Sequence, residues 1–186
     1  RLASFSSAEP GIALDPDDLA ELIPSSIRAR YGTAIAATSV GVRRMPLGPE
    51  PGGVLLARDN ACAHVTFVEG QCPSAAGEIA VSADQAKVYE HAIGTAVFVG
   101  EFDGAVSLPT ASPRTILHVV GIYEQVDGSY WFGERLTGQA SARLGFDTML
   151  TPLTTLTERV TAVDGQLTTW FERHYALDLP LLTDTC

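Results

Sequence analysis

The sequence predicts an α+β fold in which mixed or antiparallel β-sheets are combined with two to four short helices, with room for a division into two lobes. Short apolar or alternating runs recur along the chain and are separated by turns rich in Gly and Pro. Few stretches have the spacing of an amphipathic helix. The chain has 186 residues, of which 46% are hydrophobic and 18% charged, so it is long enough to bury a sizeable core.

The first part of the chain is expected to contain a linker, a helix and a strand. Residues 1–13 show no periodicity and are interpreted as a leader or linker, so the folded domain would span residues 14–186. Asp15 is a candidate N-cap, and Pro16 suits the first helical position. Residues 33–45 alternate small and β-branched side chains, which predicts a strand, and the Pro- and Gly-rich residues 45–53 predict a turn.

The middle of the chain predicts strands over residues 54–57, 63–68, 78–81, 95–99 and 114–123. A helix over residues 83–91 is expected to begin after Ser82, with Gln85 as its capping-box partner. The inner face of this helix would carry Ala86 and Tyr89.

The end of the chain has weaker signals. Residues 134–143 are expected to be helical, and Thr151 with Pro152 is expected to start a short helix. Residues 170–179 alternate apolar and polar side chains, which favours a strand.

Three cysteines are present, and two of them flank a short apolar run. Cys62 and Cys72 are ten residues apart and could close a small loop as a structural disulfide, which is the favoured interpretation. Free buried thiols and a metal or redox pair are the alternatives, although His64 alone is too little for a metal site. A disulfide would imply an oxidising, extracytoplasmic setting. Cys186 is left without an obvious partner in the sequence.

The charge balance argues against two classes of partner. The chain has 12 basic and 22 acidic residues and a net charge of −10. Such a surface repels phosphate backbones and anionic lipid headgroups, so neither nucleic-acid binding nor docking through a basic patch is expected. The sequence contains neither a signal peptide nor a run of apolar residues that could span a membrane, and since it begins with Arg1 we expect an excised fragment or a mature chain.

No motif in the sequence predicts catalysis. Phosphate-binding loops and a nucleophile elbow are absent, and no catalytic residue, cofactor site or metal site is predicted. A Ser–His–acid triad would be recognised only by geometry, but Ser82 and Ser112 are better explained as a cap and a turn residue. The histidines are isolated in the sequence and are interpreted as surface or strand residues: His64, His91, His118 and His174.

An aromatic cluster, Tyr130-Trp131-Phe132, has two interpretations. It is a candidate partner-binding surface if it is exposed. It is a lid over the end of the sheet if it is buried, and Gly133, which suggests a tight turn into the body, favours the lid.

Four segments together resemble one family. VEGQCPSAAGEIAVS (68–82) is similar to the turn, strand and helix cap of the extracytoplasmic domain in FtsX/MacB-like ABC transporter permeases. IGTAV (93–97), HVVGIYE (118–124) and YWFG (130–133) resemble further segments of that family in the same order, although Thr95 stands where Asp is common. The resemblance covers residues 53–153, a little over half of the chain.

The resemblance implies a domain without catalytic residues, inserted between transmembrane helices on the extracytoplasmic side of the cell membrane. Residues 1–13 would then follow a transmembrane helix. The implied partners are the membrane-embedded remainder of the permease, a separate ATP-binding cassette subunit, and an extracellular partner protein or cargo. The domain would couple cytoplasmic ATP hydrolysis to export or to that partner. A secreted α+β hydrolase and a stand-alone binding or adhesion protein are the alternatives.

Overall fold

The structure is a computed structural model that describes residues 31–44, 52–101, 115–142, 145–160 and 169–177. For residues 31–34, 43–44, 100–101 and 169–177 it describes the backbone alone. The expected leader, the helix after Asp15, most of the turn over residues 45–53 and the partner of Cys186 lie outside the described residues.

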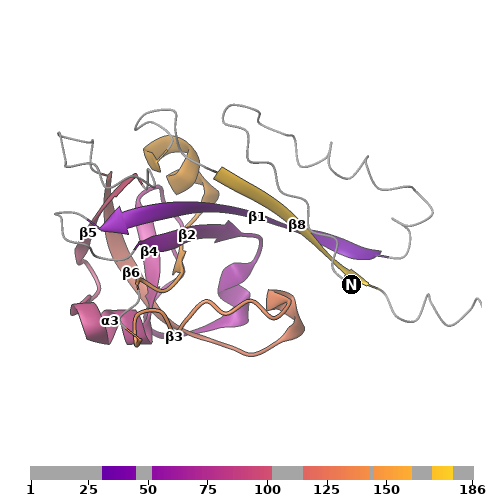
Figure 1. Ribbon diagram of the computed structural model, residues 1–186, viewed down its shortest axis with the longest axis horizontal. Helices are drawn as coiled ribbons and strands as arrows, with labels where there is room; N and C mark the ends of the chain where they lie inside the picture. Colours follow the sequence, from indigo (N-terminus) through magenta and orange to yellow (C-terminus); the bar gives the residue numbers. More distant parts are fainter. Residues whose placement is uncertain (1–30, 45–51, 102–114, 143–144, 161–168, 178–186) are drawn as a thin grey trace, which may run out of the picture.

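Eight strands belong to one mixed sheet, and the described helical elements are short, which confirms the α+β class (Figure 1). Two separate lobes are not seen among the described residues. The strands are β1 (Tyr31–Arg44), β2 (Gly53–Arg58), β3 (Val65–Gly70), β4 (Glu78–Ser82), β5 (Ala96–Glu101), β6 (Thr115–Gln125), β7 (Met149–Leu150) and β8 (Thr169–Leu177). The helical elements are the α-helix α3 (Ala83–Tyr89), the 3₁₀ turns η1 (Ala61–His64) and η2 (Ser129–Trp131), and the π-helix η3 (Thr155–Val160).

The strand pairings close into a ring. In order around it, β1 pairs with β2, β2 with β7, β7 with β4, β4 with β6, β6 with β5, and β5 with β1. The β4–β6 and β2–β7 pairings are parallel and the others are antiparallel. Since strand side chains alternate between two faces, one face of each strand points into the ring and the other points out.

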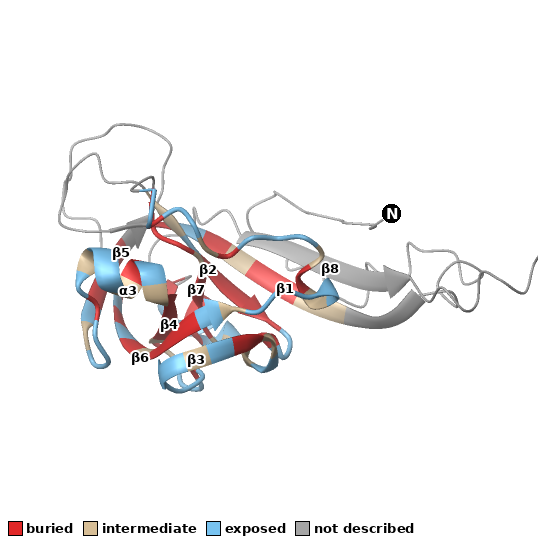
Figure 2. Ribbon diagram, turned by 90° about the horizontal axis from the view of Figure 1, so that it is seen from below, coloured by how far each residue is buried: buried red, intermediate tan, exposed pale blue. Residues whose placement is uncertain are grey.

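The inside of the ring holds the larger hydrophobic core. Along β2 and β4, Leu55, Ile79 and Val81 point inward, and each is fully buried. The members of this inner core come from the ring strands and η3, with Phe146 from the segment before β7: Val40, Val42, Leu55, Ala57, Ile79, Val81, Val97, Val99, Leu117, Val119, Ile122, Phe146, Met149, Leu156 and Val160. The buried residues therefore follow the strands (Figure 2).

A second core lies on the outer face of the same strands. Leu56 and Ala80, the neighbours of inward-facing residues on β2 and β4, belong to it. Its full membership is Ala37, Leu56, Ala61, Val65, Ala80, Tyr123, Trp131, Leu136 and Leu150, with Phe67 and Tyr130 packed against it. Elements outside the ring, namely η1, β3 and η2, thus cover one outer face of it.

The first and last described strands lie side by side. β8 pairs antiparallel with β1 over much of its length, from the pair Val40–Thr169 to the pair Tyr31–Leu177. The two strands extend beyond the ring as a ribbon (Figure 1). The predicted strand over residues 170–179 is confirmed as β8. Tyr31 and Leu177 are partners, so the described chain enters and leaves at the same end of the ribbon.

The helix predicted after Ser82 is confirmed as α3, but the capping box is only half formed. The Ser82 hydroxyl accepts a hydrogen bond from the Gln85 backbone N–H at 2.9 Å. The Gln85 side chain does not return to the Ser82 N–H, because it is fully buried, and neither of its amide atoms has a partner among the described residues. Ala86 and Tyr89 face the inner core, as predicted.

The helix predicted over residues 134–143 is wrong for the described part of that segment, which forms turns instead. Gly133 and Gly138 have φ angles of 84° and 110°, outside the helical region. The Asp147 carboxylate accepts hydrogen bonds from the backbone N–H groups of Gln139 and Ala140, at 2.8 and 3.0 Å. A side chain from a nearby part of the chain therefore takes the place of helical partners.

The short helix predicted after Thr151 and Pro152 is present, but most of it is the π-helix η3. Thr155 begins η3, and its hydroxyl accepts a hydrogen bond from the Gly77 N–H at 3.0 Å. Leu156 and Val160 bury the inner side of η3 in the inner core. None of the described helices has both the length and the hydropathy needed to cross a membrane.

Candidate functional site

The candidate site is the aromatic cap, which we define as Tyr130, Trp131 and Phe132. It consists of the 3₁₀ turn η2 and the residue after it, and it rests on the second core. Phe132 adopts a left-handed conformation with φ of 52°, which turns the chain back toward the sheet together with Gly133. This local geometry supports the turn into the body that the sequence indicated at Gly133.

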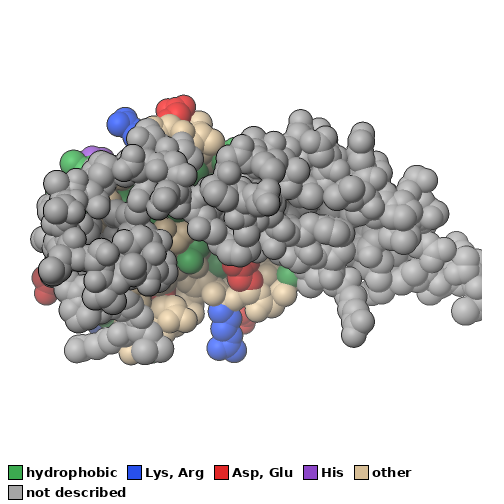
Figure 3. Space-filling model, turned by 45° about the horizontal axis from the view of Figure 1, so that its top comes forward, with side chains coloured by type: hydrophobic (Ala, Val, Ile, Leu, Met, Phe, Trp, Pro, Cys, Tyr) green, Lys and Arg blue, Asp and Glu red, His purple; other side chains and the backbone are tan. Residues whose placement is uncertain are grey.

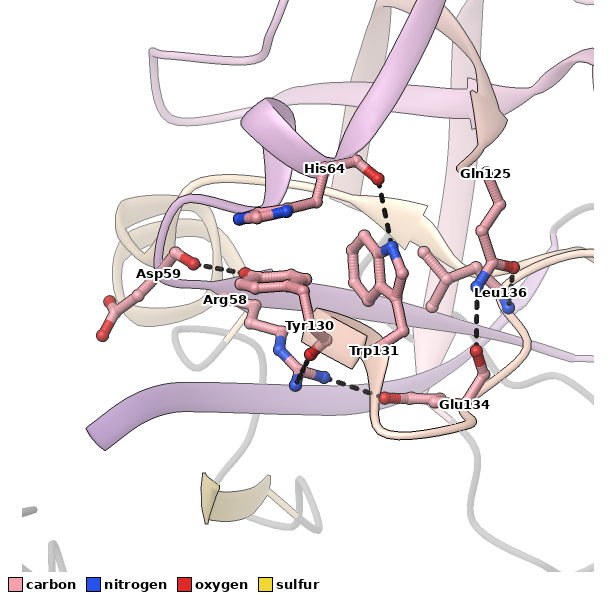
Figure 4. Close-up of polar contacts among 8 residues, drawn as sticks. All are labelled: Arg58, Asp59, His64, Gln125, Tyr130, Trp131, Glu134 and Leu136. Carbon is pink, nitrogen blue, oxygen red and sulfur yellow. Dashed lines mark hydrogen bonds and ion pairs between the residues drawn. The ribbon is translucent and has the colours of Figure 1, made fainter. Parts of the chain in front are cut away.

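Arg58, at the end of β2, anchors the aromatic cap (Figure 4). Its Nη1 forms an ion pair with the Glu134 carboxylate at 3.0 Å, and its Nη2 donates to the Tyr130 carbonyl at 2.9 Å. Its guanidinium carbon lies 4.9, 5.3 and 5.5 Å from the ring centres of the three cap residues in sequence order. A desolvated guanidinium next to aromatic faces gains cation–π attraction in addition to its hydrogen bonds.

The rings of the aromatic cap are also tied to η1 and its neighbours. The Trp131 indole N–H donates to the His64 carbonyl at 3.0 Å, and the Tyr130 hydroxyl donates to the Asp59 carbonyl. The His64 imidazole stacks on the Tyr130 ring, with centroids 3.6 Å apart (Figure 4). Tyr130 thus lies between His64 on one face and Arg58 on the other. Burial, the largest cause, raises the pKa of the Tyr130 hydroxyl.

The structure separates the two interpretations of the aromatic cluster residue by residue. Trp131 is 1% exposed and belongs to the second core, so it acts as the centre of a lid and offers no surface to a partner. Tyr130 and Phe132 are half-buried at the edge of this lid. Arg58 and Glu134 were not singled out from the sequence, because a lone Arg after an apolar strand has no distinctive pattern.

Cys62 and Cys72 form the disulfide that the sequence favours. It joins η1 to the segment between β3 and β4, and so closes the loop that contains β3. A small hollow of about 140 Å³ next to the disulfide is also lined by Arg58, Thr151 and Pro152. The disulfide and the aromatic cap therefore secure the same outer face of the ring.

A buried polar cluster lies at the N-terminus of α3. Ser82 is 1% exposed, and its hydroxyl donates to the fully buried Asp147 carboxylate while it accepts from the Gln85 N–H. Asp147 also holds the two backbone N–H groups before it, as described above. Ser82 is therefore occupied as a structural residue and is not placed as an accessible nucleophile. Asp147 was missed from the sequence, where it has no recognisable motif.

The histidines do not converge among the described residues. His64 stacks on Tyr130, His91 is buried next to Tyr89 and Phe146, and His118 is exposed on β6. The side chain of His174, on β8, is outside the described atoms. No group of three potential metal-ligating side chains occurs within the described ranges.

The described surface shows no concentration of one sign of charge on the face seen in Figure 3. The few charged side chains visible there are of both signs, and positive and negative groups lie near one another. The described charges on this face therefore do not form a single-signed binding surface.

Comparisons with known proteins give a structural likeness and no sequence-based match. No protein-family model matches the chain, and no curated protein matches it. Among solved structures, the chain is similar to a domain of a protein from Porphyromonas gingivalis that is provisionally described as a permease. The two are 14% identical, the alignment covers 95% of this chain and 73% of the other, and the TM-score is 0.44.

Proposed function

We propose that this protein is the non-catalytic extracytoplasmic domain of an ABC transporter permease of the FtsX/MacB-like type. The observation that carries the proposal is the pairing of Tyr31 with Leu177 at the end of the β1–β8 ribbon. A domain inserted between two membrane helices must receive and return the chain at neighbouring points. A ribbon whose first and last described residues are partners meets this requirement without a long connection.

The segments that resemble the permease family support the proposal because they meet in the fold. Residues 68–82 include the end of β3 and all of β4, and both strands pair with β6, which contains residues 118–124. Residues 93–97 lead into β5, which also pairs with β6. Two of the four segments therefore contribute strands that pair with the strand containing a third, and the fourth, residues 130–133, forms the lid over the same sheet.

The proposal assigns no catalytic role to this domain. Ser82, whose hydroxyl contacts the Asp147 carboxylate, is buried and hydrogen-bonded as both donor and acceptor. This arrangement supports a structural role for the residue. In the proposed function the domain moves with the membrane helices, and ATP hydrolysis takes place on a separate ATP-binding cassette subunit. The ribbon is the element through which such motion would reach the ring.

The test is to purify the full-length gene product from the membranes of its native host with an affinity tag. We expect an ATP-binding cassette protein to co-purify with it, and we expect a fluorophosphonate probe to leave the domain unlabelled. A full-length product found only as a secreted soluble protein, with no ATP-binding protein attached, would contradict the permease assignment. Labelling of a serine by the probe would favour the hydrolase.

A further inference from the structure

The disulfide between Cys62 and Cys72 lies at the surface, beside an open hollow. Cys72 is exposed and Cys62 is half-buried, and both line the hollow of about 140 Å³ next to Pro73. The hollow is smaller than the roughly 300–1,000 Å³ of small-molecule sites, but a single attacking thiol needs less space. Exposed disulfides are the labile ones, which exchange with external thiols. The position of this bond therefore gives it a chemistry beyond that of a structural cross-link.

The turn that carries Cys62 has few other ties. The Asn60 side chain, at the N-cap of η1, makes no capping hydrogen bond, and the Asn60 backbone has a left-handed φ of 58°. The Ala63 N–H donates to the Asn60 carbonyl at 2.9 Å, and Ala61 is buried in the second core. A single 3₁₀ turn is not stable by itself and depends on contacts from outside. The disulfide is the covalent tether of η1, so breaking the bond should loosen this turn.

The same turn holds the aromatic cap through His64, two residues after Cys62. The His64 imidazole stacks on the Tyr130 ring with centroids 3.6 Å apart, and the His64 carbonyl accepts the Trp131 indole N–H at 3.0 Å (Figure 4). Movement of η1 therefore acts on both rings. The strand pairings that close the ring include neither η1 nor β3, so loosening η1 leaves these pairings in place.

We propose that Cys62–Cys72 is a thiol-exchange site, at which a protein dithiol of the Cys-x-x-Cys oxidoreductase class reduces the disulfide and loosens the aromatic cap while the ring stays folded. The reverse exchange, with the disulfide form of the same class of protein, restores the aromatic cap. The proposal goes beyond the proposed function and does not depend on the permease assignment.

The exchange proceeds in two steps. A thiolate of the dithiol attacks the sulfur of Cys72, the more exposed partner, and the electron pair of the original bond leaves on the Cys62 sulfur, which is then protonated. The second thiolate of the dithiol attacks its own neighbour in the mixed disulfide, and the Cys72 sulfur leaves and is protonated in turn. Two electrons pass from the dithiol to the protein, so the dithiol ends as a disulfide and both cysteines end as thiols.

The first measurement follows reduction of the folded protein by reduced thioredoxin, with thiol titration as the readout and Cys186→Ser to remove the third thiol. We expect complete reduction without denaturant. The rate should change less than about twofold in urea below the unfolding transition, because attack on an exposed bond needs no global opening. A thioredoxin variant without its resolving cysteine should be trapped as a mixed disulfide on Cys72. No reduction of the folded protein, a rate that rises steeply with urea, or no trapped species would overturn the proposal.

The second measurement asks whether reduction reaches the aromatic cap. Hydrogen exchange of the indole N–H groups is followed by NMR on isotope-labelled protein, and Trp170→Phe identifies the Trp131 signal, since the chain has two tryptophans. On reduction, the Trp131 indole N–H should exchange at least about tenfold faster. The Val119 N–H, which donates to a carbonyl in the segment before β5, should stay protected.

The Cys62→Ser/Cys72→Ser variant is the matched control for the second measurement. Its Trp131 indole N–H should exchange as fast as in the reduced protein and should not respond to thioredoxin. Unchanged Trp131 exchange on reduction would overturn the proposal, because the disulfide would then not control the aromatic cap. Loss of protection at Val119 together with Trp131 would also overturn it, because reduction would then unfold the whole domain.

Discussion

Gly70 and Gly121 are partners in the pairing of β3 with β6, and neither position has room for a side chain. A Cβ on Gly121 would lie 2.3 Å from the Gln71 carbonyl oxygen, and a Cβ on Gly70 would lie 2.1 Å from the Val120 carbonyl oxygen. Both neighbours are backbone atoms, which cannot rotate away as a side chain would. The two glycines come from two different segments that resemble the permease family, and close backbone contact explains why both are glycine.

Gly121→Ala is expected to destabilise the protein by about 2–4 kcal/mol, because the strands β3 and β6 must separate to admit the methyl group. Chemical denaturation measures this change in the free energy of unfolding. Gly41→Ala is the matched control, since it is also a strand glycine but has no atom within 4 Å of the added Cβ. Equal stabilities of the two variants would show that the close approach of β3 and β6 is not as described.

Arg58→Ala is expected to cost about 2–4 kcal/mol in the free energy of unfolding. The substitution removes the ion pair with Glu134, the bond to the Tyr130 carbonyl and the packing against the rings of the aromatic cap. Trp131 fluorescence should shift to longer wavelength as water reaches the indole.

Glu134→Gln separates the charge of the ion pair from its geometry. The Glu134 side chain is 43% exposed and a Gln oxygen can still accept from Arg58, so we expect a loss of only about 0.5–1 kcal/mol. A loss as large as that of Arg58→Ala would mean that the charge, and not the packing of the guanidinium, holds the aromatic cap.

Cys72→Ser is expected to lower the free energy of unfolding by about 2–3 kcal/mol, because the disulfide closes a short loop in the unfolded chain. One additional free thiol should react at Cys62 in the folded protein. Thermal melting and thiol titration measure the two effects, and the Cys62→Ser/Cys72→Ser double variant should melt at about the temperature of the single variant. An unchanged melting temperature without a new thiol would show that the disulfide is not formed in the protein in solution.

Glu78 makes the stability of the turn before β4 depend on pH. Its carboxylate accepts hydrogen bonds from the Ser74 and Ala75 N–H groups at 2.8 and 2.9 Å, and these bonds hold its pKa below the ordinary value of 4.5. Because the pKa is lower in the folded state, the carboxylate stabilises the fold above pH 4.5, and this contribution is lost as the pH falls through the folded pKa.

Glu78→Gln should therefore melt at a lower temperature than the unmodified protein at pH 7, by an amount smaller than that for Arg58→Ala. The difference should shrink as the pH is lowered below 4.5. Glu124→Gln, at an exposed position on β6 with no such backbone bonds, is the control and should show no comparable change. A difference between the Glu78 variant and the unmodified protein that stays constant from pH 7 to acid would contradict the role of the charge.

Local signals predicted the parts of the fold that depend on nearby residues. Ser82 marks the start of α3 because its hydroxyl caps the helix, and the alternation in β6 and β8 is visible in the sequence. The closure of the ring depends on pairings such as Leu55 with Met149, far apart in the chain, which no local pattern encodes.

The candidate site was less predictable for the same reason. Trp131 is recognisable as part of an aromatic cluster, but its burial depends on Arg58 and His64, which are distant in sequence. The helix predicted after Glu134 is wrong because the Asp147 side chain, from the following turn, captures two N–H groups of that segment. Side-chain contacts of both kinds override local preference.

Labelling of a surface cysteine in intact cells tests most directly whether this domain lies on the extracytoplasmic side of the membrane. Lys87 is exposed on α3, so Lys87→Cys in the full-length protein offers a reactive thiol, with Cys186→Ser to reduce background. We expect a membrane-impermeant maleimide to label this thiol in intact cells, or in spheroplasts if an outer membrane blocks access. Labelling that appears only after the cells are lysed would contradict the assignment of this chain as the extracytoplasmic domain of a permease.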